Sequence, residues 1–308
     1  MVYAETLTVA ILGRFFFILA ALKNASANKA KKSVQMKQML RFTLALAGFS
    51  WLSSCAPNDK PAPATSFPKG TWVDLTYNFD EQTIYWPTAD GFRHDTVFVG
   101  VTDSGFYYEA FNYCAAEHGG THLDAPIHFA KGKQAMHEIP LDRMIGNAVL
   151  VDVTDKALSQ PDYQVSVADF QAWEQKNGKL PEGAIILLRT GYGRFWPDKL
   201  KYMGTDERGA AAVAKLHFPG LHPDAAKWLT TERSIHAIGL DTPSIDYGQS
   251  TLFESHQTLF QQNIPAFENL ANLGQLPVKG IYVVALPMKI KNGSGGPLRI
   301  VALVPEAN

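Results

Sequence analysis

Cysteine is scarce in this chain of 308 residues, which contains only Cys55 and Cys114. Two cysteines exclude a disulfide framework, and a thiolate zinc site needs cysteines that cluster. The Gly-x-Ser-x-Gly elbow of serine hydrolases is absent as well. Cys114 remains open as a nucleophile, although we expect it to be a small buried hydrophobe on its strand. Catalytic chemistry is therefore expected mainly from other side chains.

The chain also lacks an excess of charge. It holds 28 Lys and Arg against 29 Asp and Glu, and no basic stripe stands out in its main body. This balance argues against nucleic acid as a partner. With 46% hydrophobic and 19% charged residues, the composition is that of a globular protein. A chain of this length can bury a full core without disulfides.

The N-terminal part differs from the rest. Lys37 and Arg41 precede a mostly apolar stretch without charge, residues 42–54, which is too short to span a bilayer. The stretch ends in Leu-Ser-Ser-Cys at residues 52–55, which resembles a bacterial lipobox. We expect residues 36–55 to be a lipoprotein signal peptide in which Cys55 is lipidated. The alternative is a buried helix that ends in an ordinary cysteine.

Two further segments flank this signal. Residues 1–35 hold a second apolar run and a basic stretch, and we interpret them as an upstream extension before a true start at Met36, or as a signal anchor. Residues 56–70 are rich in Pro, Ala and Ser and are predicted to be a flexible tether. We therefore expect a protein of the cell envelope held on the membrane by a lipid anchor. It would be cytoplasmic if the N-terminal segment is not a signal.

The folded body is predicted to be residues 71–308. Strand-like runs rich in Val, Ile, Leu or aromatic residues lie at 72–77, 97–101, 107–114, 148–153, 185–189, 235–240, 281–285 and 300–304. Helices are predicted at 167–177, between Ser166 as N-cap and Gly178, at 223–233, and within 256–273. Strands outnumber helices, so we predict one mixed α/β domain with a substantial sheet, not a regular doubly wound fold.

Histidines concentrate in one short segment, EHGGTHLDAPIH at residues 117–128. His118, His122, Asp124 and His128 are separated by even numbers of residues, and such side chains point the same way in an extended chain. The two glycines would bend the backbone, and the proline excludes a helix through the segment. We expect a strand end or rigid loop that directs several side chains at one point.

These side chains indicate a divalent metal site. Two imidazoles and a carboxylate suit Zn²⁺ and also Mn²⁺. Three protein ligands leave positions open for water, as in catalytic sites. The alternative is a polar turn with surface histidines. The sequence favours hydrolysis by a metal-bound hydroxide, because a divalent ion lowers the pKa of water from 15.7 to about 7.

Two downstream segments are less specific. His256 and Glu268 are a candidate second pair, but a helix N-terminus with an exposed histidine would look the same. Residues 239–248 follow a predicted strand and hold Asp241 and Asp246. A capped turn explains these two carboxylates as well as a role at the site does.

The segment HGGTHLDAPIH, residues 118–128, resembles the signature His-x-Gly-Thr-His-x-Asp-x-Pro-x-His of the bacterial cyclase family, which includes kynurenine formamidases and isatin hydrolases. Residues 74–76 and 85–87 are similar to its opening strand and Trp-Pro turn. Residues 239–246 are similar to its Gly-x-Asp-x-x-Ser-x-Asp segment, and residues 256, 268–270 and 286–297 match in order. The resemblance covers nearly all of the body and implies a cyclase-like mixed sheet of the swivelling β/β/α type.

The resemblance also implies a role for each matching residue. His118, His122 and Asp124 would hold a first metal ion. A second ion, present in the dinuclear members, would be held by Asp124, His256 and Glu268, with Glu268 also reaching the first. One or two ions of Zn²⁺ or Mn²⁺ are therefore expected.

Two other matching residues would act on the substrate. His128 matches a proton-transfer histidine, and Trp86 matches a tryptophan that contacts the substrate. Core packing is the alternative for Trp86 and for the neighbouring Phe79 and Tyr85. The resemblance further implies a homodimer or a larger homo-oligomer.

The expected function is hydrolysis of a small-molecule amide, either an N-formyl aryl amine such as N-formylkynurenine or a cyclic amide such as isatin. A lipobox would place the chain outside the inner membrane, where intracellular N-formylkynurenine is not the obvious substrate. The alternative is a lipid-anchored protein that binds metal or ligand without catalysis.

Overall fold

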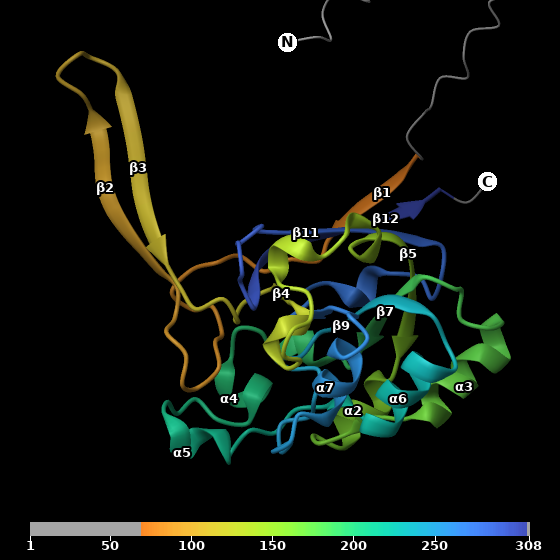
Figure 1. Cartoon of the computed structure of the whole chain (residues 1–308). Coiled ribbons are helices and arrows are strands. Elements are labelled where there is room, and N and C mark those ends of the chain that lie inside the picture. The colour runs from red at the N-terminus through yellow and green to blue at the C-terminus, as the bar shows by residue number, and fades with distance from the viewer. Residues whose placement is uncertain (1–68, 307–308) are drawn as a thin grey trace, which may run out of the picture. The chain divides into compact units, whose positions relative to one another are not determined.

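A computed structural model describes residues 69–306, so the predicted signal peptide, Cys55 and most of the predicted tether lie outside the described residues. The main sheet has eight strands in the order β1-β12-β11-β5-β7-β9-β10-β4, and β4 pairs again with β12. This second pairing closes the sheet into a barrel-like ring (Figure 1).

The strands of this sheet are β1 (Gly70–Asp74), β4 (His122–Asp124), β5 (Ile145–Asp152), β7 (Ala184–Arg189), β9 (Ile235–Leu240), β10 (Ala266–Glu268), β11 (Ile281–Pro287) and β12 (Gly295–Pro305). Two further pairs are β2 (Arg93–Val101) with β3 (Tyr107–Cys114), and β6 (Gln164–Val165) with β8 (Gly220–Leu221).

The α-helices are α2 (Thr154–Ser159), α3 (Val167–Asn177), α4 (Lys199–Met203), α5 (Ala210–Val213), α6 (Pro223–Thr231) and α7 (Glu254–Phe260). Short 3-10 helices lie at Pro126–His128, Met136–Glu138, Leu141–Arg143, Tyr192–Phe195 and Leu273–Gln275. Within the described part of the chain, no helix is long and apolar enough to cross a membrane.

Strand β7 explains why the sheet has a core on each side. Its sequence AIILLR pairs in parallel with β5 and β9. Ile186 and Leu188 pack into a core with α3, α6 and α7, whereas Ile185 and Leu187 pack into a second core to which every strand of the closed sheet contributes. A parallel strand covered on both faces requires such a continuous apolar run.

The β2–β3 hairpin projects from this body (Figure 1). Its apolar side chains are exposed on both strands, among them Val99, Val101 and Tyr107. Cys114 at its end is exposed too, so the prediction that Cys114 is buried was wrong. The strand pattern was correct, but no second layer of the described chain covers the hairpin.

The predicted mixed α/β domain is confirmed, and the ranges of β3, β9 and α3 agree with the predicted ones. Ser166 and Gly178 cap α3 as expected. Two local predictions need correction. Pro126 begins a 3-10 turn, which its fixed φ tolerates in the first position. The helix expected within residues 256–273 ends at Phe260, and Glu268 lies on a strand.

Candidate metal centre

Strand β4 places the central ligands because it lies between β10 and β12 in the closed sheet. His122 is the direct antiparallel partner of Glu268, and Asp124 is the partner of Gly295. His122 and Asp124 share one face of β4, while Leu123 points from the other face into the core. The predicted alternation of side chains therefore holds within β4. The register between β4 and β10 also brings Glu268 next to His122.

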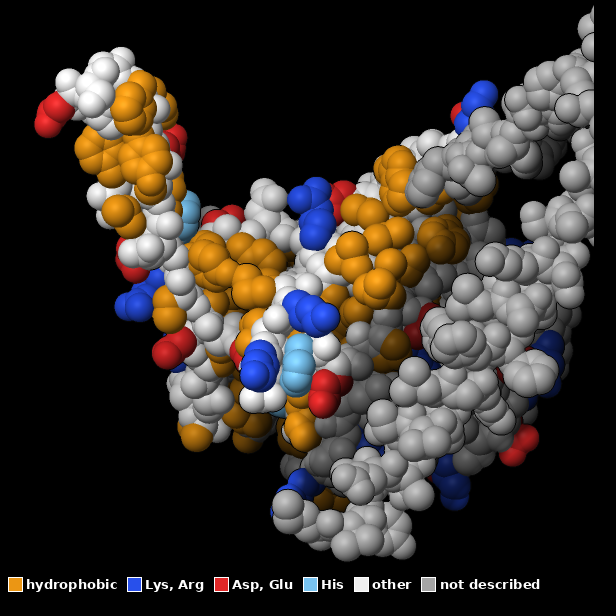
Figure 2. Space-filling view, turned by 45° about the horizontal axis from the view of Figure 1, so that its top comes forward, with side chains coloured by type: hydrophobic (Ala, Val, Ile, Leu, Met, Phe, Trp, Pro, Cys, Tyr) orange, Lys and Arg blue, Asp and Glu red, His pale blue; other side chains and the backbone are white. Residues whose placement is uncertain are grey.

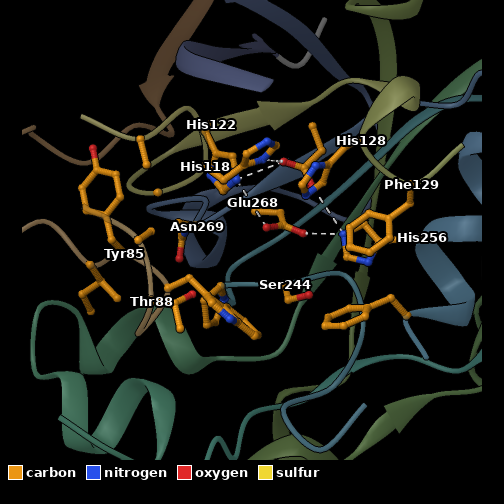
Figure 3. A pocket seen from close by; sticks show the side chains of 18 residues that line it. Tyr85, Thr88, His118, His122, His128, Phe129, Ser244, His256, Glu268 and Asn269 are labelled. Carbon is orange, nitrogen blue, oxygen red and sulfur yellow. Dashed lines mark hydrogen bonds and ion pairs between the residues drawn. The ribbon is translucent and has the colours of Figure 1, made fainter. Parts of the chain in front are cut away.

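The Asp124 carboxylate contacts three imidazoles, those of His118, His122 and His256. Figure 3 shows these three rings together with Glu268. Asp124 Oδ1 is 2.6 Å from His118 Nδ1 and 3.1 Å from His122 Nε2. Its Oδ2 is 3.4 Å from His256 Nε2. The Glu268 carboxylate completes the group, with one oxygen 3.5 Å from His122 Nε2 and the other 3.2 Å from His256 Nε2. The structure thus brings both predicted clusters together.

The ring of His122 is oriented by backbone. Its Nδ1 lies 3.0 Å from the Gly120 carbonyl oxygen, which also accepts a hydrogen bond from Asn269 Nδ2 at 2.7 Å. Gly120 has a φ of 58°, which a glycine adopts without strain. An Nδ1–H that donates to this carbonyl leaves Nε2 free to bind a metal ion.

His256 is oriented by a carboxylate. Its Nδ1 is 2.6 Å from Asp246 Oδ2, and the backbone N–H of His256 donates to the same oxygen at 3.1 Å. Asp241 has a different role, because it accepts hydrogen bonds from the backbone and hydroxyl of Thr190, both at 2.7 Å. The structure therefore separates the two carboxylates of residues 239–248: Asp246 supports the site, and Asp241 holds the loop after β7.

The ionisable side chains of the cluster shift one another's pKa values. Burial alone would lower the pKa of His122, but the adjacent carboxylates of Asp124 and Glu268 outweigh it and raise this pKa to about 9. Burial would raise the pKa of Asp124, yet His118 and the other imidazoles hold it well below its usual range. Burial and the charge of Asp124 raise the pKa of Glu268. Two buried carboxylates side by side need positive charge, from protons on imidazoles or from a cation.

A divalent cation fits this donor set. The Nε2 atom of His122 is buried and makes no hydrogen bond in the described part of the chain. Two groups have ligand atoms within 4.8 Å of one another: His118, Asp124 and His128, and His122, Asp124 and Glu268. Imidazole nitrogens and carboxylate oxygens are ligands that Zn²⁺ and Mn²⁺ accept.

His128 lies beside these residues but is held differently. Its ring stacks on that of His118 at 3.8 Å and meets Phe129 edge to face at 4.5 Å. Within residues 69–306 its ring makes no hydrogen bond. The residue as a whole is exposed, but loss of hydration at its ring lowers the pKa of His128 to about 4, and the charge of Asp124 offsets this only in part. The ring is therefore neutral at pH 7.

The cluster forms one end of a cavity of about 300 Å³. Its apolar walls are aromatic, with the rings of Phe129 and Phe253 5.1 Å apart and that of Trp86 6.4 Å from Phe253. Trp86 lines the cavity and also packs against Phe218, so its position is compatible with substrate contact and with core packing. Tyr85 lines the cavity as well, whereas Phe79 does not.

Sequence reasoning missed several residues of the site. Phe129 and Phe253 line the cavity, and no motif pointed to them. Ser244 also lines the cavity; it is the serine of the matched segment 239–246, but it was given no role. Asn269 lay in a matched segment without a role, although an asparagine directly after Glu268 was a usable signal. Phe253 has a φ of 51°, a conformation rare for a bulky residue, which only the structure could reveal.

A closed mixed sheet that carries buried imidazoles and carboxylates at the end of an apolar cavity defines a metal-dependent hydrolase. Residues 73–247 match the model of a family described as putative cyclase, and the chain belongs to this family. The match ends before His256 and Glu268, so these two residues are placed by the structure.

Curated relatives of known activity extend this result. An isatin hydrolase of Roseibium aggregatum is 31% identical over 214 residues, which are 67% of this chain and 79% of that protein. A kynurenine formamidase of Salinibacter ruber is 29% identical over 184 residues, which are 60% of this chain and 74% of that protein.

Solved structures agree. Isatin hydrolase A from Labrenzia aggregata, bound to benzyl benzoate, has a TM-score of 0.69 at 31% identity and covers 77% of this chain and 94% of its own. An isatin hydrolase bound to the product analogue thioisatinate has a TM-score of 0.69 at 27% identity, covering 76% and 92%. The chain is thus similar to enzymes that hydrolyse small amides.

Proposed function

We propose that this protein hydrolyses the amide bond of a small, flat aromatic molecule, either a cyclic amide such as isatin or an N-formyl aryl amine. The observation that carries the proposal is the metal-ligand cluster at the end of a cavity with aromatic walls. The similarity to an isatin hydrolase and to kynurenine formamidases supports the same reaction type.

The cavity favours a substrate without a carboxylate. Among the described residues that line it, none is Lys or Arg. A carboxylate carried away from the metal would lose its hydration without gaining a partner, which is costly in an apolar site. N-formylkynurenine carries an amino-acid group, whereas isatin is neutral. Neutral aryl lactams are therefore the preferred class.

The metal ligands are proposed from the family resemblance, supported by the contacts that Asp124 and Glu268 make with the imidazoles. His118, His122 and Asp124 would hold a first divalent ion, and Asp124, His256 and Glu268 a second, as Zn²⁺ or Mn²⁺. A divalent ion bound there lowers the pKa of water and polarises a carbonyl oxygen. The protein's own residues hold the reacting groups close together.

His128 is the proposed proton carrier. Because its pKa is lowered to about 4, it is neutral at pH 7 and can accept the proton of the attacking water. An amide nitrogen leaves poorly as an anion, so the same imidazolium can return the proton to it as the C–N bond breaks. Stacking on His118 keeps the ring next to the ligands through both steps.

Turnover assays with chosen substrates test this function. Protein stripped of metal and reloaded with Zn²⁺ or Mn²⁺ should hydrolyse isatin faster than N-formylkynurenine, and EDTA should abolish the activity. Activity that survives EDTA and dialysis would contradict the metal mechanism. Tight metal binding without turnover of isatin, N-formyl anilines or cyclic imides would instead support a binding protein without catalysis.

We also propose that the protein is a homodimer or a larger homo-oligomer. The β2–β3 hairpin supports this, because an isolated two-stranded hairpin is marginally stable in water. Val99 is 50%, Val101 68% and Tyr107 61% exposed, and Figure 2 shows apolar side chains along the hairpin. A second copy of the chain would cover this apolar surface. Light scattering should give a molar mass at least twice that of one chain.

The location remains a proposal that rests on the sequence. Residues 36–55 read as a lipoprotein signal, with Cys55 as the lipidated first residue of the mature chain. Intact mass spectrometry of protein from the native membrane should give a chain that begins at Cys55 and carries lipid. A mature chain that retains residues before Cys55 would contradict the lipid anchor.

A further inference from the structure

The ring of His118 is hydrogen-bonded to a residue outside the motif, Ser294, which lies far along the chain. Its Nδ1 faces Asp124 at 2.6 Å, and its Nε2 lies 2.9 Å from Ser294 Oγ. Ser294 Oγ donates a hydrogen bond to Glu117 Oε2 at 2.7 Å. A chain of two hydrogen bonds therefore runs from the ring through a hydroxyl to a carboxylate.

The proton directions in this chain fit one tautomer when Nδ1 of His118 binds a metal ion. Glu117 Oε2 also accepts the backbone N–H groups of Ser294 at 2.8 Å and Gly295 at 3.3 Å, so it acts as an acceptor. Ser294 Oγ–H must then donate to Glu117, and the hydroxyl oxygen is left to accept Nε2–H from His118. A proton on Nε2 leaves the Nδ1 lone pair for a metal ion shared with Asp124; without an ion, Nδ1 needs a proton of its own at 2.6 Å from Asp124 Oδ1.

The local backbone is shaped for these contacts. A Cβ atom at Gly295 would lie 2.5 Å from His118 Cε1, and one at Gly293 would lie 2.9 Å from Glu117 Oε1. The residues on both sides of Ser294 must therefore lack side chains for the loop to approach so closely. The pairing of Gly295 with Asp124 in the sheet fixes the position of this loop relative to the metal-ligand candidates.

We propose that Ser294 and Glu117 are positioning residues that hold His118 as the Nε2–H tautomer, and so set the affinity of the metal site for the ion that His118 binds. The inference rests on the metal site of the proposed function. The stacked His128 would depend on the same contacts, because its ring lies 3.8 Å from His118 and forms no hydrogen bond within the described residues.

Metal affinity tests the proposal without any substrate. Ser294→Ala removes the hydroxyl and keeps both backbone hydrogen bonds to Glu117. We expect the Kd for Zn²⁺ or Mn²⁺, measured by competition with a chelator, to rise roughly 10–100-fold, the usual cost of losing such a partner. Ser294→Thr keeps a hydroxyl and should restore the affinity. Ser159→Ala, at an exposed hydroxyl bonded to the Lys156 carbonyl, is the matched control.

The double variant tests whether Glu117 acts on His118 through Ser294, as a relay, or independently of it. Glu117→Gln should weaken binding less than Ser294→Ala, and the two changes together should cost no more than Ser294→Ala alone, because Glu117 acts on the ring through Ser294. An unchanged Kd in Ser294→Ala, or additive effects of the two changes, would overturn the proposal.

The Nε2 proton gives a second readout that does not need metal. In the metal-free protein, ¹⁵N NMR should show an Nε2–H of His118 that exchanges slowly with solvent in the wild type and quickly in Ser294→Ala. If the wild type bound neither metal, the proposed function would fail, and the relay would be judged on this spectrum alone. Equal exchange of this proton in both proteins would refute it.

Discussion

At the scale of single residues, the site contains two kinds of histidine. His122 and His256 are buried, and each has a hydrogen-bonded partner for Nδ1 that directs Nε2 into the cluster. His128 is held by ring stacking alone among the described residues. The proposed division into metal ligands and a proton carrier rests on this difference.

His128→Ala should therefore retain metal and lose rate. We expect kcat to fall roughly 10²–10⁴-fold, the usual contribution of a positioned acid or base. Metal content measured by elemental analysis should stay at the wild-type level. His122→Ala serves as the contrast and should lose metal. A loss of metal from His128→Ala in proportion to its loss of rate would show that His128 is a ligand.

A substitution of Trp86 tests whether the aromatic wall of the cavity contacts the substrate. Trp86→Leu keeps apolar volume against Phe218 but removes the ring that a flat substrate would stack on. Stacking contributes about 1 kcal/mol beyond buried area, so KM for an aromatic amide should rise about fivefold to tenfold. KM for an aliphatic cyclic imide should change little. Equal changes for both substrates would assign Trp86 to core packing alone.

At the scale of elements, the start of α3 depends on one carboxylate. Asp169 accepts hydrogen bonds from Lys156 Nζ at 2.5 Å, Tyr163 Oη at 2.7 Å and the Ser166 backbone at 2.7 Å. Burial would raise the pKa of Asp169, but these contacts lower it below its ordinary value. The ionised form is therefore more stable in the folded protein than in the unfolded chain.

Asp169→Asn should reduce the free energy of unfolding by about 2 kcal/mol at pH 7, because hydrogen bonds to a charged group are lost. The pH dependence has a definite sign. Since the folded pKa is the lower one, the wild-type advantage is full above the ordinary carboxyl pKa, about 4, and disappears as the pH falls through the folded value. Urea unfolding at pH 7 and pH 3 measures it, with exposed Asp155→Asn as control.

At the scale of the whole molecule, the hairpin and the barrel have opposite solvent exposure. The barrel buries alternate residues of every strand, whereas β2 and β3 leave large apolar side chains in water. Large exposed apolar patches are uncommon on monomers. Assembly through this hairpin is the simplest way to remove its apolar surface from water.

Val99→Lys combined with Val101→Lys should therefore lower the molar mass measured by light scattering at micromolar concentration. Two charges on one face of the hairpin would have to be buried without partners in an interface. Leu200→Lys is the control, because Leu200 is 58% exposed on α4, outside the hairpin. An unchanged oligomer in the double variant, or a monomeric wild type, would contradict assembly through the hairpin.

The sequence alone determined the local parts of this protein. His118, His122, Asp124 and His128 lie within eleven residues, so a short motif defines their relation. Strands β3 and β9 and helix α3 were predictable, because the period of apolar residues and the end residues of a helix act over a few neighbours.

Only the tertiary structure decided which distant residues join the motif. Glu268 reaches His122 through the pairing of β10 with β4, and Ser294 reaches His118 because β12 closes the sheet against β4. These positions depend on strand register, which arises from contacts between segments more than a hundred residues apart. No local pattern specifies such contacts, since a strand shifted by one residue turns every side chain to the other face.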